Sequence, residues 1–144
     1  MTTVREIMTA GVEYAEDTDS IANVAQRLAV ADIGAVPVCD KEGLLKGIVT
    51  DRDIVIRVVA RGLDTVETKA GVLADQSQVV AVGLNDDVRV AVEVMKNHRV
   101  RRLPVLDGDR VVGLISQADL AGSVPEGEFS DLLAVISSPG VAPG

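Results

Sequence analysis

Two short segments of the sequence carry side chains that could bind a ligand. Thr50-Asp-Arg-Asp53 and Ser116-Gln-Ala-Asp119 each place a hydroxyl three residues before a carboxylate. A carboxylate where a strand runs into a helix can accept hydrogen bonds from both hydroxyls of a ribose. Free N–H groups at a helix start favour a phosphate. The same pattern is also that of a capping box, which stabilises a helix start and binds nothing. The pattern alone leaves both interpretations open.

The other reactive residue types do not form a recognisable catalytic or metal-binding set. The sequence has a single histidine, His98, and a single cysteine, Cys39. A His/Cys metal site and an intrachain disulfide are therefore excluded. His98 ends a basic helical segment, where we expect an exposed cap, and Cys39 falls in a core strand, where we expect a buried thiol. No glycine phosphate loop, nucleophile elbow or triad is readable. We predict a protein that is not an enzyme and holds no metal.

Both candidate segments belong to an internal repeat. Residues 33–40 align with residues 100–107 at an offset of 67, and residues 47–54 align with residues 113–120 at an offset of 66. Upstream, each copy has apolar residues at positions i, i+3, i+4 and i+7, which is the stripe of an amphipathic helix. These residues are Ile21, Val24, Ala25 and Leu28 in the first copy, and Val88, Ala91, Val92 and Met95 in the second.

Each copy is predicted to fold as β-α-β-β-α. A helix capped near residues 18–20 or 85–87 follows a first strand, and a hairpin and a second helix come next. The first copy's second helix is predicted to end at Arg61, with Gly62 as a left-handed cap. The fold class is α+β, with the two repeats packed sheet to sheet about a pseudo-twofold axis, because one copy is too small to bury its sheet alone. The predicted strands are 12–15, 35–39 and 45–50, then 79–82, 103–106 and 111–116.

The repeats set the predicted domain limits. We expect one domain at residues 3–62, a second at 68–123, and a short helix and tail at 124–144, with the helix at 128–136 and a frayed tail from 137. Residues 63–76 link the copies. Within this linker, residues 68–73 repeat the lead-in at residues 3–8.

Composition excludes several classes of partner. The net charge is −8, and Tyr14 and Phe129 are the only aromatic residues. An acidic chain without stacking aromatics does not suit nucleic acid. No run approaches the ~20 apolar residues of a membrane span, and the N-terminus has no apolar signal segment. We therefore predict a cytoplasmic protein that binds neither nucleic acid nor membrane.

The repeated Pro-Val strands and Gly-apolar-apolar-Thr/Ser-x-x-Asp junctions resemble a tandem CBS domain pair, also called a Bateman module, over about residues 3–123. Residues 95–105 and the chain length are most similar to the actinobacterial hypoxic response protein 1-like group. The resemblance implies a regulatory, non-enzymatic homodimer of stress response. Such a module would bind AMP, ADP, ATP or S-adenosylmethionine in a cleft between the repeats and signal to an effector protein. The alternative is a ligand-free interaction protein that keeps the fold.

The resemblance also implies site residues. The ribose would be held by the four junction residues, Thr50, Asp53, Ser116 and Asp119. The adenine would lie against backbone at Val12, Ile33, Gly34, Ala35 and Val36, with Val79 and residues 100–103 as the second copy's equivalents.

The two copies differ just ahead of the proline. The second has Arg101 and Arg102 where the first has Gly34 and Ala35. The two guanidinium groups could contact phosphate, fill the pocket, or pair with surface acids. We expect unequal sites, with Asp53 in the working one, because Gly34 and Ala35 leave room there.

Overall fold

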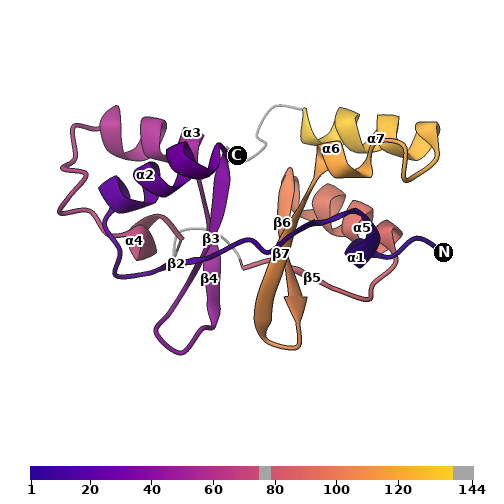
Figure 1. Cartoon of the computed structure of the whole chain (residues 1–144). Coiled ribbons are helices and arrows are strands. Elements are labelled where there is room, and N and C mark those ends of the chain that lie inside the picture. The colour runs from indigo at the N-terminus through magenta and orange to yellow at the C-terminus, as the bar shows by residue number, and fades with distance from the viewer. Residues whose placement is uncertain (75–78, 138–144) are drawn as a thin grey trace. The chain divides into compact units, whose positions relative to one another are not determined.

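The structure, a computed structural model, describes residues 1–74 and 79–137, which form two compact units (Figure 1). The first-repeat unit starts at Glu13 and holds the first repeat and the linker helix. The second-repeat unit combines Met1–Val12 with the described residues 80–137. The N-terminal lead-in, indigo in Figure 1, therefore belongs with the second repeat.

The first-repeat unit has a three-stranded sheet, in the order β2-β3-β4. Strand β2 runs parallel to β3, and β4 pairs antiparallel with β3. Helix α3 continues directly into a π-helical segment, η1, in which the Ala60 N–H donates to the Val55 carbonyl. The elements are β2 Ala15–Glu16, α2 Ile21–Ala31, β3 Ala35–Cys39, β4 Leu45–Thr50, α3 Asp51–Ile54, η1 Val55–Val59 and α4 Ala70–Ala74.

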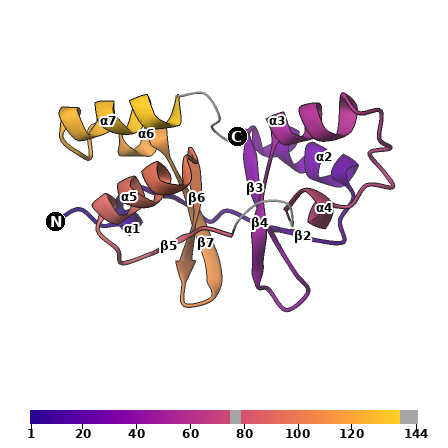
Figure 2. The ribbon, with the colours of Figure 1, turned by 180° about the vertical axis from the view of Figure 1, so that it is seen from behind.

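The second-repeat unit has a four-stranded sheet, in the order β1-β7-β6-β5. Strands β5 and β6 are parallel, and β7 is antiparallel to both β6 and β1; β5 lies beside β6 in the view from behind (Figure 2). The elements are α1 Val4–Ile7, β1 Thr9–Ala10, β5 Val82–Gly83, α5 Val88–His98, β6 Arg102–Asp107, β7 Arg110–Ser116, α6 Gln117–Leu120 and α7 Glu126–Ile136.

The first long helix of each repeat starts and ends in the same way. The Ser20 hydroxyl caps α2 by accepting the Asn23 N–H, and the Asp87 carboxylate caps α5 by accepting the Arg89 N–H. Both helices end at a left-handed residue with φ of 54°, Asp32 or Arg99. The predicted caps are confirmed. The two repeats also share a left-handed backbone conformation at the end of this helix.

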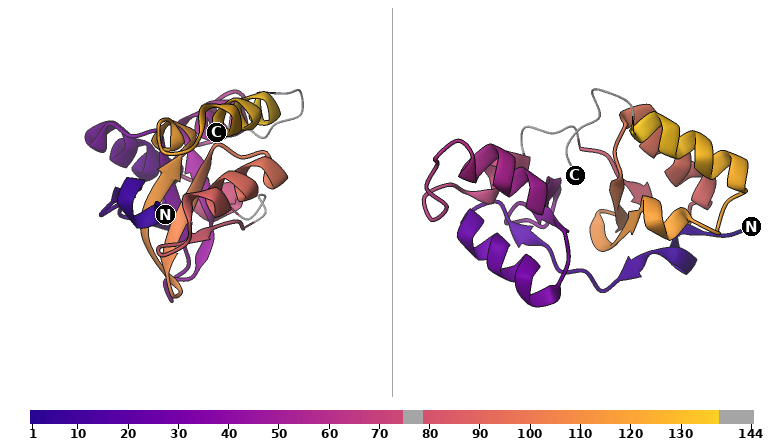
Figure 3. Two further views of the ribbon diagram at one scale, coloured as in Figure 1. Left: turned by 90° about the vertical axis from the view of Figure 1, so that its right-hand side faces the viewer. Right: turned by 90° about the horizontal axis from the view of Figure 1, so that it is seen from above.

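Each unit has its own apolar core, formed by the predicted stripe of its long helix and by its sheet. The stripe prediction is confirmed except that Ala25 is only partly buried. In the second-repeat unit, α7 packs along α5 (Figures 1 and 3). It adds Leu132 and Ile136 to the core. The predicted C-terminal helix is thus confirmed, starting at Glu126 rather than at residue 128. The tail predicted from residue 137 lies, after its first residue, outside the described residues.

The lead-in segments are exchanged between the repeats. The Val4 N–H at the start of α1 donates to the Asp86 carbonyl of the second repeat, and the Ala70 N–H at the start of α4 donates to the Asp19 carbonyl of the first, both at 2.8 Å. Val4 and Ala70 are fully buried. Strand β1 then approaches β7 so closely that a Cβ at Gly113 would lie 2.5 Å from the Thr9 carbonyl oxygen. The repeat of residues 3–8 at 68–73 therefore marks two equivalent docking segments.

Several predicted boundaries were wrong, including those of β6, which spans Arg102–Asp107 rather than 103–106, and β7, which starts at Arg110 rather than 111. Strands β2 and β5 are two residues long and start three residues later than predicted. Only Ala15–Glu16 and Val82–Gly83 pair with the neighbouring strand. The helical segment after Thr50 ends at Val59 rather than Arg61, because its last turn is a wide π turn. Gly62 does adopt the predicted left-handed conformation, with φ of 71°.

Candidate functional site

Both Thr/Ser-x-x-Asp segments form the same reciprocal cap at a strand-to-helix junction. In the first repeat, the Thr50 N–H donates to Asp53 Oδ2 and the Asp53 N–H donates to Thr50 Oγ1, each at 3.0 Å. In the second repeat, the Ser116 N–H donates to Asp119 Oδ2 at 2.9 Å, and the Asp119 N–H donates to Ser116 Oγ at 3.3 Å. The capping interpretation thus describes real contacts in both copies. It uses one carboxylate oxygen in each and leaves Oδ1 for other partners.

Strand register brings the residues ahead of the proline next to each junction. Ala35 pairs with Thr50 across the first hairpin, and Arg102 pairs with Ser116 across the second. One residue earlier, the carbonyls of Gly34 and Arg101 each accept the first N–H of the following helix at 2.9 Å. These four predicted residues therefore lie beside the junctions.

The other predicted base-contacting residues are placed less uniformly. Ile33 is exposed, whereas the Val36 side chain is buried in the first-repeat core and can offer a ligand only its backbone. Val12 is grouped with the second repeat, not with residues 33–36. Val79 is exposed.

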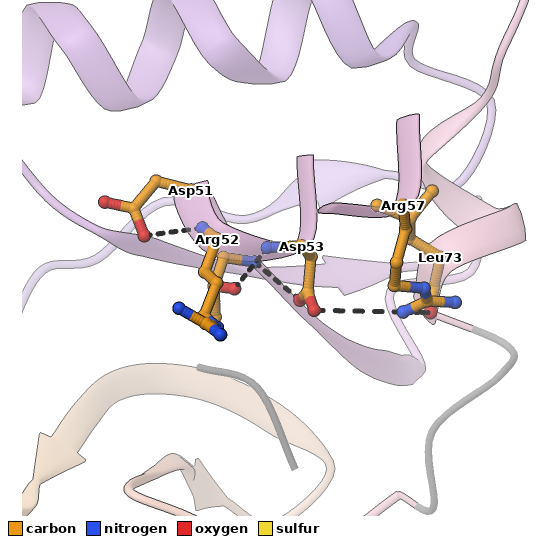
Figure 4. Close-up of polar contacts among 6 residues, drawn as sticks. Asp51, Arg52, Asp53, Arg57 and Leu73 are labelled. Atoms are coloured by element: carbon orange, nitrogen blue, oxygen red, sulfur yellow. Dashed lines mark hydrogen bonds and ion pairs between the residues drawn. The ribbon is translucent and has the colours of Figure 1, made fainter. Parts of the chain in front are cut away.

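The first junction has an additional cation. Arg57, on η1, lies one helical turn after Asp53 and places Nη1 3.9 Å from Asp53 Oδ1 (Figure 4). The same nitrogen donates to the Leu73 carbonyl of α4 at 3.3 Å. The side chains of Arg57 and Asp53 are 18% and 9% exposed. Both oxygens of the Asp53 carboxylate therefore face donors of the protein itself.

The second junction has no counterpart to this cation. Helix α6 ends at Leu120, Ala121 is extended, and Gly122 is left-handed with φ of 81°. Ser123, which aligns with Arg57, donates its hydroxyl to the Asp119 backbone carbonyl at 3.3 Å. Within the described residues Asp119 has no ion pair, and its side chain is only half-buried. Asp119 Oδ1 therefore has no hydrogen bond or ion pair among the described residues.

A second polar atom near this junction is unsatisfied. Gln117, the first residue of α6, has a buried Oε1 that accepts no hydrogen bond from the described residues. A buried acceptor without a partner costs free energy, which a donor on a bound molecule would recover. The second junction thus offers acceptors on both Asp119 and Gln117.

Cys39 and His98 occupy the expected structural positions. Cys39 is fully buried in β3, and burial, with a smaller contribution from Asp40, raises the pKa of its thiol to about 11. His98 is exposed at the end of α5. Among the described residues, no three His, Cys, Asp or Glu side chains are grouped as metal ligands. The same residues include no helix that is both long enough and apolar enough to cross a membrane.

Comparison with known proteins identifies the repeats. The model of the CBS domain matches residues 4–60 and again residues 74–126. The chain belongs to the CBS domain family. It is 40% identical to hypoxic response protein 1 of Mycobacterium tuberculosis over 139 residues, which is 96% of each chain. It is 33% identical to the CBS domain-containing protein YhcV of Bacillus subtilis over 84% of each chain.

A solved CBS protein gives the structural counterpart. The crystal structure of hypoxic response protein I with two coordinated zinc ions superposes with a TM-score of 0.76 at 41% identity, covering 86% of this chain and all of that one. The predicted family and the predicted mixed α and β fold of two repeats are thereby confirmed.

Sequence reasoning did not single out Arg57. The signal was present, because an arginine four residues after a helical aspartate is the spacing of an ion pair on one helix face. Its aligned position in the second repeat holds a serine, so the repeat alignment itself marked the difference.

Proposed function

We propose that this CBS-pair protein is a regulatory module that binds an adenine nucleotide or adenosyl compound through its junction carboxylates. The observation that carries the proposal is the Asp119 carboxylate. It is oriented by the Ser116 N–H through one oxygen, while the other oxygen has no described partner. A carboxylate fixed in this way is a good acceptor for the hydroxyls of a ribose.

The surroundings of Asp119 suit the rest of a nucleotide. Arg102 lies across the hairpin from Ser116, so its side chain starts beside the junction. We propose that Arg102 contacts a phosphate, for which a guanidinium is well suited. Of the three roles open to the arginines, phosphate contact fits a site that already contains a carboxylate for the ribose.

Ligand binding would act as a signal only if it favours one of two states. The chain would respond by a shift in population, which requires that the ligand bind one conformation more tightly than the other. A separate effector protein would recognise that conformation. The cytoplasmic location stays a prediction, supported by a single buried cysteine.

A thermal-shift screen tests the proposal. AMP, ADP, ATP and S-adenosylmethionine would be compared with GTP and NAD. A compound at 100 times its Kd should stabilise the protein by about 2.7 kcal/mol and raise Tm by several degrees. The Asp119→Asn variant should lose this response while its Tm without ligand changes little. A flat response to all four adenosyl compounds would contradict the proposal.

A ligand-free interaction protein is the second candidate, and one observation favours it. Val55, Ile56 and Val59 on η1 are 54%, 42% and 58% exposed. Clustered exposed apolar side chains are typical of an interface. We propose that this apolar face supports a homodimer whether or not a ligand binds. Sedimentation of the wild type and of Val59→Glu tests this, since the variant should be monomeric at a protein concentration where the wild type is dimeric.

The zinc coordination of hypoxic response protein I does not suit the cysteine and histidine of this chain. The only thiol of this chain is fully buried, and the only imidazole is exposed on a helix end. Structural zinc sites use four ligands, mostly Cys and His. We therefore propose an adenosyl ligand rather than a metal.

A further inference from the structure

The first repeat contains an arginine where a ligand would need access. Arg57 Nη1 faces Asp53 Oδ1 at 3.9 Å, while Asp53 Oδ2 already accepts the Thr50 N–H at 3.0 Å. A ribose that approached this carboxylate would compete with a cation of the same chain. The competition is intramolecular, so the cation is present at a high effective concentration.

Arg57 is also fixed from a second side. Its Nη1 donates to the carbonyl of Leu73 in α4 (Figure 4). Helix α4 is in turn held on the first repeat by the hydrogen bonds from Ala70 and Gly71 to the carbonyls of Asp19 and Asp17. The ion pair is mostly buried, so salt screens it less than a surface pair. The hydrogen bond to Leu73 therefore helps to hold the guanidinium of Arg57 beside Asp53.

The fold explains why only one repeat has this arrangement. In the first repeat the chain stays helical past Asp53, through α3 and into η1, so residue 57 returns to the face that carries the carboxylate. In the second repeat the chain leaves the helix after Leu120, and the Ser123 hydroxyl donates to the Asp119 backbone carbonyl. The serine at residue 123 therefore supplies no cation to the carboxylate of Asp119.

We infer that Arg57 closes the first junction, so that each chain binds a single adenosyl ligand, at Asp119. The inference rests on the proposed function and adds the residue that selects between two otherwise similar junctions. The first junction then has a structural role only. Thr50 and Asp53 form a helix cap, and Arg57 neutralises the carboxylate.

Calorimetric titration of the full chain tests this selection. AMP, ADP, ATP and S-adenosylmethionine would each be titrated into the wild type and four variants. Arg57→Met keeps an unbranched apolar stem and removes the charge. Arg61→Met, at an exposed position of the same unit, is the matched control for charge. Asp119→Asn removes the carboxylate of the open junction, and the double variant Arg57→Met/Asp119→Asn separates the two junctions.

The expected stoichiometries differ for each protein. The wild type and Arg61→Met should bind one molecule per chain, and Arg57→Met should bind two. Asp119→Asn should lose at least about tenfold in affinity, because a hydrogen-bonded charge is removed. The double variant should again bind one molecule per chain, now at the first junction. If Arg57→Met fails to fold, as judged by its thermal melt, Arg57→Gln serves the same comparison.

Several results would overturn the selection while leaving the proposed function intact. These are two molecules bound per wild-type chain, binding that depends on Asp53 rather than Asp119, or weaker binding in Arg57→Met. The last result would mean that Arg57 is itself a ligand contact. If no protein in the set binds any of the four compounds, the proposed function fails and the selection fails with it.

Discussion

The two junctions share a cap and differ in what surrounds its carboxylate. Asp53 is buried and faces Arg57, whereas Asp119 is half-buried and has no ion pair among the described residues. The two caps make the same pair of hydrogen bonds, with lengths of 3.0 and 3.0 Å in the first repeat and 2.9 and 3.3 Å in the second. The comparison shows that the course of the chain after a capping carboxylate decides whether a cation of the same chain lies beside it.

The difference arises a few residues after the carboxylate. The first repeat continues as a π-helix that returns a cation to Asp53, and the second breaks at Ala121 and Gly122 before α7 begins. Duplicated sequences therefore need not give a retained carboxylate the same surroundings in both copies. The predictions below test this asymmetry between the repeats, in order of decreasing effect.

The largest effect is expected at Gly113, where the lead-in strand β1 joins the second repeat. In Gly113→Ala the added Cβ would lie 2.5 Å from the Thr9 carbonyl oxygen, which is backbone and cannot rotate away. We expect a loss of about 3 kcal/mol of unfolding free energy. Faster hydrogen exchange should follow at the Gly11 amide, which donates to the Val112 carbonyl.

The matched control for Gly113 is Gly127→Ala in α7. A Cβ at Gly127 meets nothing within 4 Å, and alanine favours a helix, so this variant should gain about 0.5–1 kcal/mol. Equal stability of Gly113→Ala and the wild type, in denaturant melts, would show that the second repeat does not depend on close docking of β1.

Replacing each capping carboxylate should separate the structural junction from the open one. Asp53→Ala removes a buried cap and leaves Arg57 without its carboxylate, so we expect a loss of about 2 kcal/mol. Asp119→Ala removes only a cap, and about 1 kcal/mol should be lost. The order should be the reverse for ligand-induced stabilisation, which Asp53→Ala should keep.

Urea melts with and without AMP or ATP measure both quantities on the same proteins. The proposed difference between the two junctions is contradicted if Asp119→Ala is the less stable variant, or if Asp53→Ala loses the response to nucleotide. Either result would favour a working site in the first repeat, as the small residues Gly34 and Ala35 predict.

The comparison of the two junctions shows what the sequence could reveal about the candidate site. Gly34 and Ala35 predict room beside Thr50, and strand register does place Ala35 there. Space near a carboxylate does not decide whether the carboxylate is available, because Arg57 reaches it from the other side. The four-residue spacing of Asp53 and Arg57 is visible in sequence, but its meaning depends on the helix continuing past residue 54.

The fold was predictable where local patterns are strong. The hairpin strands 35–39 and 45–50 were predicted to the residue, because an apolar run, a turn and a second apolar run define them. The strands β2 and β5 were misplaced, because two-residue pairings leave almost no pattern. The π turn of η1 also has no local signal. The exchange of the lead-ins appeared only as a weak repeat, since docking partners far apart in sequence are set by tertiary contacts.

The free energy of unfolding at high pH should include a contribution from Cys39, which lies in the first repeat. The second repeat has Leu106 at the aligned position, so only the first-repeat core contains a thiol. Burial raises the pKa of Cys39 from 9.0 to about 11. The folded state therefore keeps its proton above pH 9 while the unfolded state loses it. Stability is full below pH 9 and falls by about 2 kcal/mol as the pH rises to 11.

Cys39→Val provides the reference, because valine fills a similar apolar space and does not titrate. Other groups titrate in the same range in both proteins, so the difference between their denaturant melts at pH 8 and at pH 11 isolates the thiol. Parallel losses in the two proteins would show that the thiol ionises as easily in the folded state as in the unfolded one.

The smallest effects are expected at the left-handed residues that end α2 and α5. Both Asp32→Gly and Arg99→Gly should gain about 0.5 kcal/mol of unfolding free energy, or about 2 °C in Tm, because glycine adopts a φ of 54° without strain.

The two gains in stability should depend on salt concentration in opposite directions. Asp32 is an anion at the negative end of a helix dipole, so part of its gain is relief of repulsion and shrinks as salt increases. Arg99 is a cation at such an end, so its replacement also removes an attraction, and its gain grows as salt screens that loss. Thermal melts at low and high salt measure both trends, and a common salt dependence would mean that the helix dipoles do not distinguish the two repeats.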